Sequence, residues 1–262
     1  MKLLSRVLVL TTLLAPGLAL AASEGVALDH IETDHSDLPS LQRGAQMYMN
    51  YCLGCHSLEH QRHVRTAQDL GIPEDLYREN LIFSEADIGS HITNAMPEEG
   101  SKNWFGAAPP DLTMVTRVRG ADWVYTYLRR FYLDPSRPLG VNNDVLANAG
   151  MPHVLIELQG VPRKVCKQAP VKGSGGEVRD ALEPGKAVTE EQCGFIEVEE
   201  GTGLLSAAEY DEAVYDLVNF LDYTGEPYKQ DRQRIGVYVI LFLIVLFVFS
   251  WLLGREYQKE VH

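Results

Sequence analysis

Apolar and polar positions occur in distinct blocks along this chain, and the first block is a short apolar run at residues 7–14. Basic Lys2 and Arg6 precede it, and small residues come after it in an A-x-A arrangement that ends at Ala21. A basic start, a short apolar core and a small-residue cleavage pattern are typical of a secretory signal peptide. We therefore predict that residues 1–22 are a signal.

A second and longer apolar run covers residues 235–253, where all but two residues are apolar. A helix needs about 20 such residues to cross the core of a bilayer. We predict a transmembrane helix here, preceded by a linker at 229–234 and followed by a tail at 254–262. Because a signal peptide directs export of the chain behind it, residues 23–228 are expected outside the cytoplasm and the tail inside.

Between these runs, apolar residues recur at three- and four-residue spacing in three segments, which predicts three amphipathic helices. The first segment is 41–52 with Ser40 as a candidate N-cap, the second is 121–132, and the third comes after a capping box from Ser206 to Glu209. The apolar faces are Leu41, Ala45, Tyr48, Met49 and Cys52, then Trp123, Tyr127, Leu128 and Phe131, and finally Tyr210, Val214, Leu217, Val218 and Leu221. The exported domain is therefore expected to be mostly α with long loops.

The charge of the chain is strongly negative, at −13 over 262 residues. Residues 23–228 hold 16 Lys and Arg against 33 Asp and Glu, a net charge of −17. Such a surface repels nucleic acid and can attract a basic protein partner over long range. Solubility alone is the alternative explanation of the same charge.

The residues Cys52-Leu53-Gly54-Cys55-His56 form the C-x-x-C-H signature of covalent haem attachment. Two thiols on one helical turn can form thioethers to the vinyl groups of one haem, and the next residue offers an imidazole to the iron. The rival interpretations are a thioredoxin-like redox pair and half of a zinc site. Export and the adjacent histidine favour one covalent haem c.

A sixth iron ligand decides whether such a haem transfers electrons or binds small molecules, and histidine–methionine ligation suits electron transfer. Met47 and Met49 are too close to the motif in sequence to reach the opposite haem face. Met151 is the leading candidate because Gly150 and Pro152 flank it, with Met96 and Met114 as alternatives. Any of these methionines can instead fill the core.

Several further segments accompany the haem motif in a fixed order. They are Arg43-Gly44, Gly106-Ala107-Ala108-Pro109-Pro110-Asp111-Leu112, Val115-Thr116-Arg117-Val118-Arg119-Gly120, Gly150-Met151-Pro152, and the stretch from Tyr215-Asp216-Leu217-Val218-Asn219-Phe220-Leu221 to Glu226-Pro227. This ordered set, with a C-terminal anchor after it, resembles the bacterial cytochrome c1 family, the haem subunits of the cytochrome bc1 complex (quinol–cytochrome c reductase).

The resemblance implies a c-type cytochrome haem domain whose last helix packs on the first, and it implies roles for individual residues. Met151 matches the axial methionine of the family. Arg119 matches an arginine near a haem propionate, for which a forked guanidinium is suited. A carbonyl at Pro109 or Pro110 resembles the acceptor for the second ring nitrogen of His56, a bond that would fix the ring and tune the iron.

The chain departs from the family pattern at two places. Where the family often has Met-Ala-Pro-Pro, this chain has Met151-Pro152-His153, which leaves the loop shape and the role of His153 open. Residues 159–204 are long and polar, and we interpret them as a surface insertion closed by a disulfide between Cys166 and Cys193. Closure of that loop contributes about 3–4 kcal/mol in the chain-entropy description. A flexible turn is expected at 173–176.

The resemblance also implies a function and partners. The chain would be a single-pass protein of the bacterial inner membrane with its haem domain in the periplasm. It would take an electron from a Rieske iron–sulfur protein and pass it to a soluble or tethered cytochrome c, within a dimeric complex that includes cytochrome b. It would perform no substrate chemistry of its own. The alternatives are a haem sensor or peroxidase with an open iron, and an anchored cytochrome that donates to a terminal oxidase or reductase.

Overall fold

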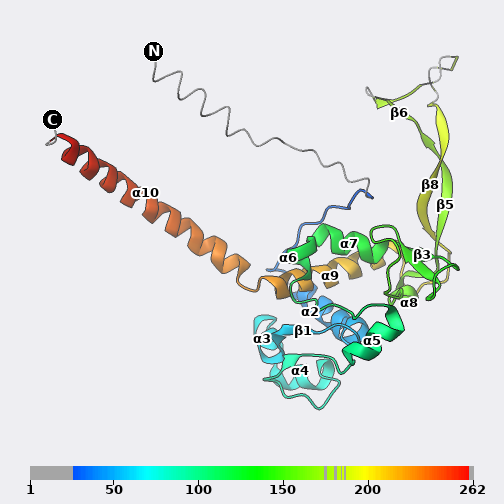
Figure 1. Cartoon of the computed structure of the whole chain (residues 1–262), viewed down its shortest axis with the longest axis horizontal. Helices are drawn as coiled ribbons and strands as arrows, with labels where there is room; N and C mark the ends of the chain where they lie inside the picture. The colour runs from blue at the N-terminus through cyan, green and yellow to red at the C-terminus, as the bar shows by residue number, and fades with distance from the viewer. Residues whose placement is uncertain (1–25, 174–175, 180–181, 184, 186, 260–262) are drawn as a thin grey trace.

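The structure is a computed structural model that describes residues 26–173, 176–179, 182–183, 185 and 187–259. The expected signal at 1–22 and the end of the expected tail lie outside the described residues, as do Ser174 and Gly175 of the expected turn. Within the described part, the domain has more helix than strand, with long loops between the elements, and one long helix extends away from it (Figure 1).

The elements succeed one another with short strands between the helices. The helices are α2 (Leu38–Met47), the π-helix η1 (Tyr48–Cys52), α3 (His63–Asp69), α4 (Glu74–Leu81), α5 (Glu98–Phe105), α6 (Val115–Arg119), α7 (Ala121–Arg129), α8 (Ile156–Gln159), α9 (Ala207–Gly225) and α10 (Lys229–Lys259). The strands form antiparallel pairs: β1 (Leu58–Arg62) with β2 (His91–Ile92), β3 (Phe131–Leu133) with β4 (Val141–Asn143), β5 (Pro162–Pro170) with β8 (Thr189–Val198), and β6 (Lys172–Gly173) with β7 (Gly176–Glu177).

Helix α2 packs on α9 and forms the core of the domain with it, as the resemblance implied. All five residues of the predicted apolar face of the first helix are buried, from Leu41 to Cys52. The predicted N-cap was wrong: the carboxylate of Asp37 accepts the backbone N–H of Ser40, and the helix begins at Leu38. Ser40 is instead completely buried and bonds Asn219 of α9 through its hydroxyl oxygen.

Helix α9 begins as the sequence predicted. The side chain of Ser206 accepts the backbone N–H of Glu209, and the Glu209 carboxylate accepts the backbone N–H of Ser206. Its predicted apolar stripe is buried throughout. Helix α7 begins at Ala121 as expected but ends at Arg129, because Phe131 leaves the helix and pairs with Asn143 in the β3–β4 ribbon.

The expected surface insertion contains a long β-hairpin. Strands β5 and β8 pair antiparallel along their whole length and project from the helical body (Figure 1). Cys166 and Cys193 face each other in the ladder and are joined by a disulfide. Most side chains of both strands are exposed, so backbone pairing and the disulfide hold this hairpin together more than burial does.

Helix α10 is the one helix of the described residues that is long and apolar enough to cross a membrane. It begins at Lys229, so residues 229–234, which we expected to be a linker, form its first turns. Only residues 226–228 separate it from α9. Glu226 forms ion pairs with Arg117 of α6 at 2.7 Å and with Arg232 of α10 at 2.6 Å. The junction is therefore bonded on both sides.

Candidate functional site

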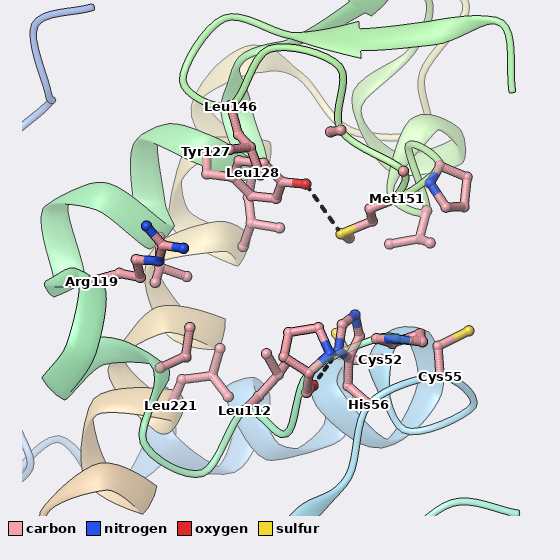
Figure 2. A pocket seen from close by; sticks show the side chains of 18 of the residues that line it. Cys52, Cys55, His56, Leu112, Arg119, Tyr127, Leu128, Leu146, Met151 and Leu221 are labelled. Atoms are coloured by element: carbon pink, nitrogen blue, oxygen red, sulfur yellow. Dashed lines mark hydrogen bonds between the residues drawn. The ribbon is translucent and has the colours of Figure 1, made fainter. Parts of the chain in front are cut away.

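A cavity of about 310 Å³ lies between the end of α2–η1 and the loop that contains Met151. Its lining is predominantly apolar and comes from η1, the 105–115 segment, α7, the 146–154 loop and α9. All six residues predicted to bind the cofactor line it: Cys52, Cys55, His56, Pro110, Arg119 and Met151. Segments distant in sequence thus meet around one chamber, as Figure 2 shows.

The two thiols lie on the turn that ends η1. Cys52 ends the π-helix, where Leu53 N–H bonds the Tyr48 carbonyl, and Cys55 N–H and His56 N–H then bond the Cys52 carbonyl at 3.0 and 2.8 Å. Cys52 is buried, Cys55 is half-buried, and neither is in a disulfide. Burial raises the pKa of the Cys52 thiol to about 12 and also raises the pKa of Cys55. Catalytic redox pairs need a lowered thiol pKa, so this environment disfavours the thioredoxin-like interpretation.

The imidazole of His56 is held by a single backbone acceptor. Its Nδ1 lies 2.7 Å from the carbonyl oxygen of Pro110 (Figure 2), which is one of the two acceptors expected from sequence. Burial lowers the pKa of His56, although the bond to Pro110 opposes this. A neutral imidazole that donates from Nδ1 leaves a lone pair on Nε2, which is the form that binds a metal.

Pro110 is itself fixed against the motif by backbone and side-chain bonds. Leu112 N–H donates to the Ser57 carbonyl at 2.9 Å, and Glu59 N–H donates to the Asp111 carboxylate at 2.6 Å. The second oxygen of Asp111 accepts Thr113 N–H at 2.9 Å. These bonds connect the 110–113 segment to the residues just after His56. They therefore hold the Pro110 carbonyl in place beside the imidazole.

Met151 lies on the opposite wall of the cavity from His56 (Figure 2). Of the methionines in the described residues, it alone lines the cavity; Met96 and Met114 lie elsewhere, and Met114 is exposed. The loop is closely packed, since a Cβ on Gly150 would overlap the carbonyl oxygen of Phe105. The hydroxyl group of Tyr127 donates to Met151 Sδ at 3.6 Å.

His153, whose role the sequence left open, supports this loop from outside the cavity. Its ring stacks on Phe131 at 5.0 Å with a 3° interplanar angle, and its Nε2 lies 2.6 Å from Gln159 Oε1. Burial lowers the pKa of His153 to about 4, against the opposing effect of the Gln159 bond. It is therefore a neutral packing residue that fixes the chain two residues after Met151.

Arg119 lies at the side of the cavity, and its guanidinium carbon is 5.1 Å from the centre of the Trp123 ring. Its neighbour Arg117 points elsewhere and pairs with Glu226. A guanidinium at the edge of an apolar chamber can bind a carboxylate there.

Several residues of the cavity wall were not recognised as such from the sequence, among them two aromatic residues of α7. Trp123 and Tyr127 were predicted as an apolar helix face, yet both line the cavity. Their spacing of four residues on α7 was the available signal, because it places both rings on one side of the helix. No cluster of three or more His, Cys, Asp or Glu side chains that could hold a metal ion occurs among the described residues.

Comparisons with known proteins agree with this arrangement. Residues 30–261 match the model of the Cytochrome C1 family. The chain is 49% identical to the cytochrome c1 of Allochromatium vinosum, over 98% of this chain and 100% of that one. It is 38% identical to a protein of Nitrosomonas europaea named ammonia monooxygenase gamma subunit, over 97% of both chains. It is 27% identical to the cytochrome c1 of Rhodospirillum rubrum, over 80% of this chain and 77% of that one.

Proposed function

This chain belongs to the cytochrome c1 family, and on that premise we propose that it relays single electrons from a Rieske iron–sulfur protein to a cytochrome c. As a member of the family it is an electron-transfer subunit of a cytochrome bc1 complex and carries a covalent haem c. The proposal covers three points: the electron donor and acceptor of the chain, the residues that bind the iron, and the orientation of the chain in the membrane.

The observation that supports the proposal most directly is the placement of His56 and Met151 on opposite walls of one apolar cavity. The residues present fit a c-type haem: two free thiols on one turn, a neutral imidazole with its Nε2 available, and a thioether across the chamber. When bound, the haem supplies reversible one-electron chemistry at iron, and histidine–methionine ligation raises the potential. Cys52 and Cys55 would hold it covalently.

The other residues of the chain prepare the site for electron transfer without bond-making chemistry. The Pro110 carbonyl orients the imidazole of His56, and the Asp111 bonds hold that carbonyl in place. The apolar walls exclude water and keep small molecules away from the metal. Arg119 would pair with a propionate at the edge, where the two opposite charges stabilise each other.

We further propose that the domain faces the periplasm of a bacterium, with α10 as a single span in the inner membrane beside cytochrome b. The apolar length of α10 supports this anchoring. The net charge of −17 on residues 23–228 supports a basic acceptor, because opposite charges accelerate encounter between proteins.

The test uses the full chain in membranes, purified through a tag on the chain. We expect cytochrome b and a Rieske protein to co-purify with it. The reduced complex should pass electrons to a basic cytochrome c at a rate that falls steeply between about 10 and 200 mM salt. A rate independent of salt would contradict the charged docking surface, and a complex without the two neighbours would contradict the assignment of donor.

Carbon monoxide separates this proposal from the open-iron alternative. With His56 and Met151 both bound, the reduced spectrum is expected to stay unchanged when the gas is added. An immediate spectral shift in the full complex would show an open or weak sixth position. It would favour the sensor or peroxidase interpretation.

A further inference from the structure

Tyr127 contacts Met151 through the hydroxyl group at the far end of its side chain. The oxygen lies 3.6 Å from Sδ, and the bond is directed from the wall formed by α7 toward the Met151 loop (Figure 2). A thioether sulfur is a weak acceptor that bonds at longer distances than oxygen does. No other hydrogen bond to this sulfur is found among the described residues.

Packing fixes the position of this hydroxyl oxygen. The ring of Tyr127 stacks parallel to Trp123 at 5.0 Å and meets the edge of Phe131 at 5.1 Å. Tyr127 is buried, and a phenol with its ordinary pKa of about 10 is protonated at neutral pH and able to donate. A ring packed on two sides keeps its hydroxyl oxygen within reach of Met151 Sδ, and the O–H bond can turn toward that sulfur.

The backbone of Tyr127 is tied to the same loop. Its carbonyl oxygen accepts a hydrogen bond from the side-chain amide of Asn143 at 2.7 Å. The amide oxygen of Asn143 in turn accepts Val145 N–H at 2.8 Å and Leu146 N–H at 3.3 Å. One residue of α7 thus holds the start of the loop through its carbonyl and the end of the loop through its hydroxyl group.

We propose that Tyr127 is a positioning residue for Met151, whose hydroxyl group holds the thioether toward the cavity and stabilises the reduced state of the metal bound there. The positive end of the O–H dipole points at the sulfur, so it favours the state with one more electron. This inference rests on the proposed ligation of iron by Met151.

The expected effect depends on the strength of one hydrogen bond. Removal of the hydroxyl with retention of the ring, Tyr127→Phe, should shift the equilibrium of reduction about two- to tenfold toward the oxidised form. For a one-electron couple this corresponds to a potential lower by about 20–60 mV. The oxidised form should also bind added imidazole about two- to tenfold more tightly, because the methionine is held less firmly.

The matched control is Tyr125→Phe, which removes a hydroxyl group from the same helix at a position that does not line the cavity. Both variants are compared in the purified full complex by redox titration, by the sulfur-to-iron charge-transfer absorption of the oxidised form, and by imidazole titration. A lower potential with a weaker absorption in Tyr127→Phe alone would support the inference. No change, or an equal change in both variants, would overturn it.

Two further variants keep the result interpretable. Met151→Leu is expected to abolish the charge-transfer absorption; if it does not, Met151 is not the ligand, and this inference falls together with that part of the proposed function. If it does, and Tyr127→Phe changes nothing, only the role of Tyr127 is rejected. A fluorinated tyrosine at position 127, which is a stronger donor, should raise the potential, and a lower potential would overturn the inference.

Discussion

Gly44 in α2 lies directly against the backbone of Asp216 in α9. A Cβ at position 44 would overlap the carbonyl group of Asp216 and approach the Cβ of Phe220. The adjacent Arg43 bonds the carboxylate of the same Asp216 with both Nε and Nη2, at 2.5 and 3.0 Å. The close approach and the ion pair together fix how α2 packs against α9.

Substitution of Gly44 by alanine is expected to force the two helices apart. Overpacking of this kind costs about 1–3 kcal/mol. The free energy of unfolding of the haem-loaded chain, measured with urea by absorbance, should fall by that amount. Gly89→Ala is the control, because a Cβ there meets no atom within 4 Å. Equal stability of the two variants would contradict the close contact.

The buried histidine at position 63 should make stability depend on pH. Burial lowers its pKa to about 4 in the folded chain, against 6.5 for an unperturbed histidine. The unfolded chain therefore binds the proton first, and stability is lost as pH falls from about 6.5 to about 4. His63→Phe should flatten the stability curve in that window. The same substitution at the exposed His60 is the control, and an equal flattening in both variants would contradict the assignment to His63.

Asp222 connects the N-terminal segment to the start of α10. It accepts hydrogen bonds from Thr33 at 2.7 Å, His35 at 2.9 Å and Lys229 at 2.9 Å. Although burial raises its pKa, these bonds hold that pKa well below its usual range. Its contribution is therefore present above about pH 4 and lost only as pH falls through the lower folded value.

We expect Asp222→Ala to lower the free energy of unfolding at neutral pH by about 2–3 kcal/mol, because three donors lose their acceptor. Residues 26–37 should also exchange amide hydrogens faster, which mass spectrometry can monitor. The exposed Glu85→Ala serves as the reference. Unchanged exchange in the N-terminal segment would show that other contacts hold it.

The disulfide between Cys166 and Cys193 should stabilise the hairpin alone. No described residue of 159–204 lines the cavity, so replacement of both cysteines by serine should leave the haem potential within experimental error. The loop of 27 residues corresponds to about 3–4 kcal/mol in the chain-entropy description. Limited proteolysis should therefore cut the hairpin sooner in the variant. A shifted potential would contradict this separation.

The sequence was sufficient where local signals determine structure. The capping box at Ser206 and the apolar stripe of α9 are confirmed because both depend on residues within a few positions of one another. The first helix was misjudged at its start. Pro39 is favoured in the first turn of a helix, so the N-cap had to come before it, at Asp37. The prediction of Ser40 did not take Pro39 into account.

The β5–β8 hairpin could not be predicted from hydrophobic pattern. Strands of a half-buried sheet alternate apolar and polar residues, whereas both faces of this ribbon are mostly exposed. Ion pairs between the strands, such as that of Lys167 with Glu197, connect their exposed side chains where other sheets have a buried apolar face. Phe131 was misassigned for a related reason, since its strand partner Asn143 is twelve residues away and the helical spacing at 121–131 conceals the end of the helix.

In the candidate site, too, local features could be predicted from the sequence and distant contacts could not. The motif from Cys52 to His56 was recognised because its residues lie next to one another in the sequence. Its flanking residues and the resemblance favoured Met151, but Met96 and Met114 stayed open until the tertiary structure placed Met151 at the cavity and Met114 on the surface. The contact of Tyr127 with Met151 joins residues 24 positions apart and has no pattern in the sequence.

The bonded junction between α9 and α10 has a consequence for how electrons travel. Only three residues separate a helix of the core from the membrane span, and Glu226 is paired with cations on both sides. With α10 in the membrane as proposed, the domain would have no long tether on which to swing. The proposed donor and acceptor would then have to move to the metal site, because the site could not move to them.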